Sequence, residues 1–192
     1  MHPSQGITYM TDGKDSVSVY SRGLYEVEVT DDAQRAVALT LFRSPANETW
    51  EVSPNETALI KELNFEYSFS AVGQNETEAL QEGETWRSAL KALHFKPSCQ
   101  GNLPAEFKFI EDTAKTAVLS FAKLNENGEF EVRYYNISDA EKFKLTLPVN
   151  VEEAVYTDFN GKRLASAYFK DNVVEIEIGT HKIATVAIKF VK

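Results

Sequence analysis

The sequence is short of the residues from which many catalytic and metal sites are built. Of its 192 residues, one is a cysteine, Cys99, and three are histidines: His2, His94 and His181. A single cysteine excludes an internal disulfide and a thiolate metal cluster. The histidines form none of the His-x-His, His-x-Asp or His-Glu-x-x-His spacings that hold zinc. We therefore predict no metal ligands, no bound cofactor and no catalytic residue in this chain.

Positive charge and long apolar runs are also scarce. The formal net charge is -9, which repels phosphate backbones and anionic membrane surfaces, so we expect neither nucleic acid nor membrane as a partner. No apolar run approaches the roughly 20 residues that a membrane span needs, and no leader-like segment is visible. These features, with the lone cysteine, favour a cytoplasmic location, and a secretory compartment is the alternative.

Carboxylates are abundant, with 29 Asp and Glu residues, but their pattern is that of solvated strands. Glu26 and Glu28, like Glu175 and Glu177, alternate with apolar residues, which places them on the polar side of a strand. A glycosidase needs two carboxyls flanking one bond, and the sequence selects no such pair. Gly-x-Ser-x-Gly and phosphate-binding glycine loops are missing.

Some aromatic and asparagine positions have two interpretations. Exposed aromatic rings could stack on sugars, although aromatic side chains more often fill cores; the candidates are Trp50, Trp86, Tyr134 and Tyr135. Asn-x-Ser/Thr sequons are glycan acceptors in secreted proteins and otherwise reflect polar loop composition; they occur at Asn47, Asn55, Asn75 and Asn136.

The chain is organised around residues 15–29, which alternate with period two on both sides of Ser21-Arg22-Gly23. Val17 and Val19 share one face of the first segment, which predicts a half-buried strand. A short strand at residues 7–10 and the turn signal Asp12-Gly13 precede it, so we predict a hairpin. Arg22, beside the bend, is either part of a binding rim or a clamp that pairs with a carboxylate such as Glu26 or Asp32.

The rest of the chain predicts a mainly β protein, an antiparallel β-sandwich with two subdomains. In the second half, apolar residues alternate with polar ones in several short segments joined by Asn, Asp and Gly turns, which is typical of a small sandwich; these segments are 130–134, 143–147, 174–178 and 184–190. The best helix candidate is residues 85–93, with Trp86, Ala89, Leu90 and Leu93 on one face. Pro and Gly residues in 96–106 mark a boundary, which divides the chain into 1–103 and 104–192.

An ordered set of short motifs spans nearly the whole chain: His2-Pro3-Ser4-Gln5-Gly6, Asp12-Gly13, Arg22-Gly23-Leu24-Tyr25-Glu26-Val27-Glu28-Val29, Leu39-Thr40-Leu41-Phe42-Arg43-Ser44, Phe65-Glu66-Tyr67, Trp86-Arg87-Ser88-Ala89-Leu90 and Val132-Arg133-Tyr134-Tyr135-Asn136. Taken in this order, the motifs resemble the C-terminal β region of glycoside hydrolase family 38, the α-mannosidases. The resemblance implies part of a large β-sandwich region over 1–103 and a small immunoglobulin-like sandwich over 104–192.

The same resemblance implies a supporting, non-catalytic role. In this family the zinc site and the nucleophile belong to an N-terminal barrel, which has no counterpart in these residues. The parent would be a zinc-dependent retaining α-mannosidase acting on terminal α-mannosides. The partner of this chain would be the catalytic barrel of the same polypeptide, homo-oligomerisation is left open, and Arg22 and Gln5 would face the rim of the sugar site. The alternatives are a free-standing carbohydrate-binding module and a purely structural sandwich used in adhesion.

Overall fold

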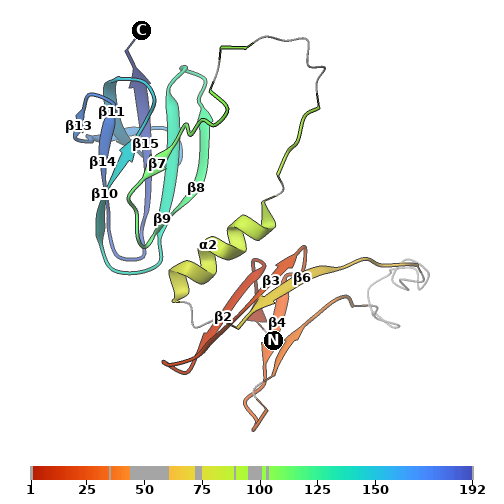
Figure 1. The fold of residues 1–192 in the computed structure, drawn as a ribbon. Coiled ribbons are helices and arrows are strands. Elements are labelled where there is room, and N and C mark those ends of the chain that lie inside the picture. The colour runs from red at the N-terminus through yellow and green to blue at the C-terminus, as the bar shows by residue number, and fades with distance from the viewer. Residues whose placement is uncertain are drawn as a thin grey trace, which may run out of the picture. The chain divides into compact units, whose positions relative to one another are not determined.

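The computed structural model describes residues 2–34, 36–43, 61–71, 75–88, 90–94, 101–102 and 104–191. The chain forms two compact units, Met1–Leu93 and His94–Lys192, each of which is described by itself (Figure 1). The expected division at 103/104, with the sandwich assigned to each side, stays a prediction. Within the described ranges, no helix is long and apolar enough to cross a membrane.

Unit 1 contains two three-stranded antiparallel sheets. One has the order β1-β4-β5 and the other β2-β3-β6; the strands are β1 (His2–Pro3), β2 (Ile7–Thr11), β3 (Ser16–Arg22), β4 (Glu26–Val29), β5 (Val37–Leu39) and β6 (Glu66–Ser70). The predicted hairpin is confirmed, because β2 pairs with β3 around the turn at residues 12–15.

The buried face of β3 is the opposite of the one expected. Ser16, Ser18 and Tyr20 are 7%, 1% and 1% exposed, whereas Val17 is 38% exposed. The alternation was identified correctly, but the expectation that the valine face would be the half-buried one was wrong. Small serines on the inner face leave room for a helix to approach closely, which is a tertiary requirement that a hydrophobic pattern does not reveal.

The helix lies earlier than expected. α2 (Glu76–Arg87) is the one α-helix with described bounds, and the predicted helix at 85–93 overlaps only its last residues. It begins at Asn75, whose side chain accepts from the Glu78 backbone N–H while the Glu78 carboxylate accepts from the Asn75 N–H. This capping box starts the helix before the stretch whose apolar spacing predicted one. Ser88 is already extended, and Leu90 and Leu93 are 100% and 89% exposed.

Unit 2 is a two-sheet antiparallel sandwich, as predicted. One sheet has the order β13-β14-β10-β7 and the other β12-β11-β15-β9-β8; the strands are β7 (Glu111–Asp112), β8 (Ala117–Leu124), β9 (Phe130–Asn136), β10 (Glu141–Thr146), β11 (Val151–Thr157), β12 (Arg163–Ser166), β13 (Phe169–Lys170), β14 (Val173–Ile178) and β15 (Ile183–Phe190). The alternating segments found in the sequence correspond to β9, β10, β14 and β15.

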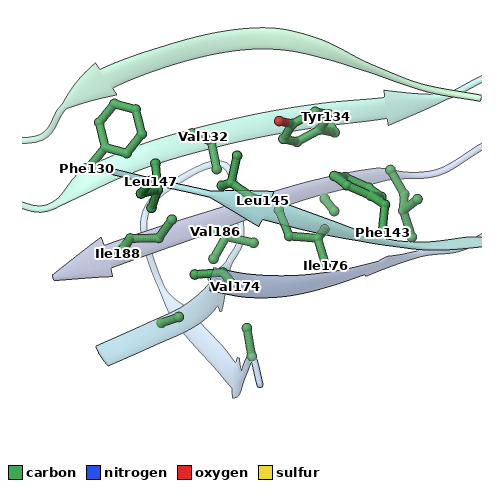
Figure 2. Packing of buried hydrophobic residues seen from close by; sticks show 14 of the residues in the cluster. Phe130, Val132, Tyr134, Phe143, Leu145, Leu147, Val174, Ile176, Val186 and Ile188 are labelled. Carbon is green, nitrogen blue, oxygen red and sulfur yellow. The ribbon is translucent and has the colours of Figure 1, made fainter. Parts of the chain in front are cut away.

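The core of unit 2 is formed by the inward residues of these strands (Figure 2). Val132, Val174, Ile176 and Val186 have no measurable exposure. These residues alternate with outward ones that are mostly polar or small, so the two inner faces meet to form the core. Burial of this apolar surface is the main stabilising term for the unit.

Candidate functional site

The predicted rim lies at a double bend in unit 1. The chain passes from one sheet to the other at residues 4–6 and again at 23–25. The two bends are joined, since the Ser4 N–H donates to Tyr25 O and the Ser21 N–H to Gly6 O, both at 2.8 Å. Gly6 has a φ of +89°, and a Cβ there would lie 2.6 Å from Ser21 O, so only glycine fits.

Arg22 leaves the end of β3 and contacts β6 and α2. One Nη is 2.5 Å from a carboxylate oxygen of Glu66, which is its cross-strand partner in the β3–β6 pair. The other Nη donates to the backbone oxygen of Trp86, and the guanidinium lies over the Trp86 ring, 4.6 Å from its centroid. The clamp partners suggested by the sequence are not the ones used here, because Glu26 pairs with Arg43 at 2.5 Å.

These contacts place Arg22 at the C-terminal end of α2. Trp86 O belongs to the last turn, whose carbonyls have no partner within the helix, and the helix dipole makes this end negative. Arg87 adds a second cation to the same turn, and its side chain borders Gly6, where a Cβ would lie 3.2 Å from its Nε. Arg22 therefore satisfies a helix end while its side chain stays 41% exposed.

Gln5 lies at the tip of the first bend and is exposed. Its neighbour Gly6 accepts a hydrogen bond from Ser21, the residue before Arg22. The structure thus brings the loop of Gln5 to the strand end of Arg22. That they border a sugar site stays a prediction.

A metal site among the described residues would need several ligating side chains close together. No three His, Cys, Asp or Glu side chains among them gather to hold a metal ion, so a zinc site does not fit this part of the chain. Glu175 and Glu177 both bind Lys142, at 2.8 and 3.1 Å, as expected for a solvated strand face. Cys99 lies outside the described residues.

The candidate aromatic and asparagine positions differ in burial and in the contacts they make. Tyr134 is a core residue, 1% exposed, and donates to Asp112 at 2.9 Å; burial raises the pKa of its hydroxyl strongly. Trp86 is half-buried and packs beside Tyr20 with a centroid distance of 6.4 Å, so neither it nor Tyr134 is an open platform. Tyr135 is half-buried, Asn136 is 4% exposed and Asn75 caps α2, while Trp50, Asn47 and Asn55 lie outside the described residues.

Sequence reasoning missed a hollow of about 560 Å³ on the outer face of the five-stranded sheet in unit 2. Arg133 extends across it between the rings of Phe121 and Phe159, with Cζ 4.3 and 4.5 Å from the two centroids. Its Nε donates to Thr185 Oγ1 at 2.8 Å. The only signal in the sequence was the alternation that places Arg133 on the side of β9 away from the core.

Comparisons with known proteins find similarity in structure but not in sequence. A scan against models of protein families gives no match, and a search of curated proteins gives none either. A glycosyl hydrolase family 38 protein from Enterococcus faecalis matches 97% of this chain with a TM-score of 0.77 and 17% sequence identity. An alpha-mannosidase from Enterococcus faecalis V583 matches 98% with a TM-score of 0.76 and 17% identity.

These matches confirm the predicted structural resemblance to glycoside hydrolase family 38. At such low identity the likeness establishes a shared fold. The chain spans only 22% and 21% of the length of the two solved chains, so it corresponds to about a fifth of each.

Proposed function

We propose that this chain is the non-catalytic C-terminal β region of a longer zinc-dependent retaining α-mannosidase that hydrolyses terminal α-mannosides. The observation that carries the proposal is the fold match over nearly the whole chain to about a fifth of a glycosyl hydrolase family 38 protein and of an alpha-mannosidase. The ordered motifs from His2-Pro3 to Tyr135-Asn136 support the same assignment. In it, residues 1–103 belong to the large β-sandwich region and 104–192 form the small immunoglobulin-like sandwich.

The supporting role requires a surface for the catalytic barrel, and unit 1 has a suitable one. On β3 and β6, the face opposite Tyr20 carries Val17, Tyr67 and Phe69, which are 38%, 59% and 73% exposed. Contiguous apolar side chains on a sheet face are typical of surfaces that another domain covers. In this proposal the barrel of the same polypeptide packs on that face.

The chemistry would belong to the rest of that polypeptide. Zinc would grip sugar hydroxyls there, and two carboxyls would serve as nucleophile and acid/base. This chain would contribute rigidity and the rim residues Arg22 and Gln5. Nothing in the described part needs a secreted setting, and the proposed parent is a cytoplasmic, bacterial-type enzyme.

The direct test is an activity assay. The purified 192-residue chain, supplied with zinc and an aryl α-mannoside, should release no aryl alcohol above the rate of a buffer blank, because in this proposal the zinc and the reacting carboxyls belong to the barrel. Release that scales with chain concentration would overturn the non-catalytic assignment. The reading frame upstream of Met1 gives a second test: a stop codon there contradicts the proposal, and a barrel-coding stretch with His-x-Asp supports it.

The rim assignment has its own test in the longer enzyme. If Arg22 and Gln5 border the sugar site, Arg22→Ala and Gln5→Ala should raise KM or lower kcat of the enzyme that remains folded, whatever stability Arg22→Ala also loses. Arg43→Ala, which breaks the Arg43–Glu26 pair elsewhere in unit 1, is the matched control. A loss of stability with unchanged kinetics in the remaining folded enzyme would show that Arg22 acts only as a clamp.

A further inference from the structure

The outer face of the five-stranded sheet in unit 2 has the construction of a binding groove. Two cross-strand rows run over it. Phe121, Arg133, Thr185, Thr157 and Arg163 make the first row, and Lys123, Glu131, Ala187 and Val155 the second. The middle of the two rows is occupied by the short side chains of Thr157, Thr185 and Ala187. They form the floor and are 8%, 4% and 5% exposed. Long side chains rise on either side, which leaves the hollow of about 560 Å³.

The walls of the groove are charged side chains that partners hold in place. Glu129 and Glu131 are only 12% exposed in their side chains; Arg163 binds Glu129, and Arg133 lies 3.6 Å from Glu131. Arg163 also binds Glu153 at 2.7 Å, and the hydrogen bond to Glu153 raises the pKa of Arg163. Fixed charges of this kind present donors and acceptors in set positions without the entropy cost of ordering them on binding.

The groove is electrically balanced although the chain carries a net charge of -9. Glu126, Glu129 and Glu131 stand against Lys123, Arg133 and Arg163 among the lining residues. A phosphate or carboxylate ligand would meet as many repelling carboxylates as attracting cations. A neutral ligand rich in hydroxyl groups fits better, because each hydroxyl can donate to a carboxylate and accept from a guanidinium.

Two further features point to a ring-shaped, partly apolar ligand. Phe159 is 65% exposed at the edge of the hollow; Arg133 covers one face of its ring, and the exposed remainder can contact the C–H face of a sugar. On the floor, Thr157 Oγ1 is buried and has no hydrogen-bond partner among the described residues. Buried hydroxyls are usually paired, so an unpaired one at a groove floor is a place for a ligand or water to bind.

From these observations we infer that unit 2 binds a neutral oligosaccharide in the groove formed by Glu131, Arg133, Thr157 and Phe159. The hollow lies within the roughly 300–1,000 Å³ range of small-molecule sites. A peptide strand is a poorer occupant, because it would need a free strand edge, whereas the groove crosses β9, β15 and β11, which are paired on both sides. The inference goes beyond the supporting role proposed above and does not depend on it.

Titration of the isotope-labelled 192-residue chain with mannotriose, maltotriose and cellotriose, followed by amide NMR shifts, tests the groove. At least one sugar should saturate, with the largest shifts at residues 131–133, 157–159 and 185–187. Phe159→Ala and Glu131→Gln should each weaken Kd at least about tenfold. Tyr168→Ala is the matched control: Tyr168 is 62% exposed in the same unit, does not line the hollow, and should leave Kd within about twofold of the original.

Three results would overturn the inference. One is the absence of saturable shifts with all three sugars up to about 10 mM, beyond the weak end of the usual affinity scale. Another is an equal effect of Phe159→Ala and Tyr168→Ala. The third is a set of shifts confined to residues outside the groove, which would mean that the sugar binds elsewhere on the chain. None of these experiments measures mannoside hydrolysis. Their outcome therefore leaves the proposed function to be tested separately.

Discussion

The guanidinium of Arg22 lies over the ring of Trp86 while one of its nitrogens donates to the Trp86 backbone oxygen. The two residues are 64 positions apart, yet one side chain both covers the aromatic ring and caps the last turn of α2. The contact ties the helix to the strand that precedes the second bend. Its strength can be measured independently of any sugar site.

Arg22→Ala should lower the free energy of unfolding of unit 1 by about 1–2 kcal/mol, because it removes a cation–π contact and two charge-assisted hydrogen bonds on a partly exposed side chain. Arg22→Lys should recover only part of this, since an ammonium cannot reproduce the planar fork. Urea unfolding followed by tryptophan fluorescence reports on unit 1, which contains both tryptophans.

The control for Arg22 is Arg43→Ala, which breaks an ion pair whose arginine side chain is 63% exposed. We expect a loss of less than about 0.5 kcal/mol from this exposed pair. Equal losses for the two variants would mean that the contacts of Arg22 with α2 add nothing.

Gly83→Ala should destabilise unit 1 although alanine favours helices. A Cβ at Gly83 would lie 2.8 Å from side-chain carbons of both Ile7 and Tyr20, so α2 would have to move away from β2 and β3. The gain of about 1 kcal/mol in helix propensity is smaller than an overpacking cost of up to about 3 kcal/mol. Gln81→Ala, on the exposed side of the helix, should be neutral in the same urea titration. A more stable Gly83→Ala variant would contradict the close packing.

Asn136→Ala should destabilise unit 2 by about 2–3 kcal/mol, because a buried amide that joins two loops is lost. The Asn136 Nδ2 donates to Asp139 O at 2.6 Å and to Gly179 O at 3.1 Å, and its Oδ1 accepts from the Ser138 N–H. Thermal unfolding by circular dichroism measures the loss, with Asn127→Ala in an exposed turn as the control. For the same reason, mass spectrometry after expression in a secretory host should find Asn136 without a glycan in folded protein.

Glu141 should make unit 2 less stable in acid. Its partial burial raises the pKa, but hydrogen bonds from the N–H groups of Thr116, Lys115 and Ala117 and from the Thr116 hydroxyl outweigh this, so the pKa lies below its ordinary range. A lowered folded-state pKa means that the unfolded chain binds more protons. The stabilisation is present above the unfolded-state pKa of about 4.3 and is lost as the pH falls through the lower, folded-state value.

Hydrogen exchange can monitor the urea unfolding of unit 2 between about pH 3 and about pH 7. The free energy of unfolding should fall with decreasing pH at the acid end of this range. Glu141→Gln should flatten that slope and lower the stability at neutral pH. Glu126→Gln in an exposed turn is the control and should leave the slope intact. An unchanged acid slope in Glu141→Gln would remove Glu141 as its source.

Local pattern was sufficient for the sandwich of unit 2. Phe130, Val132 and Tyr134 alternate with polar residues, and the strand they form, β9, buries all three of these side chains. The hairpin at Asp12-Gly13 could also be predicted from the sequence, because the pairing of two strands across a short turn depends on neighbouring residues alone. The mainly β class followed from such segments, and the resemblance to family 38 rested separately on the ordered short motifs.

Interactions between distant residues were decided by the tertiary structure. The burial of Ser18 in place of Val17 depends on α2, which packs on that face, and the partner of Arg22 depends on pairing between β3 and β6. The groove around Arg133 needs five strands side by side before its two rows exist. The sequence by itself determined that its alternating segments are strands, because period-two alternation is a local property of the chain. Which face is covered, and which charges meet, was set only by packing between segments tens of residues apart.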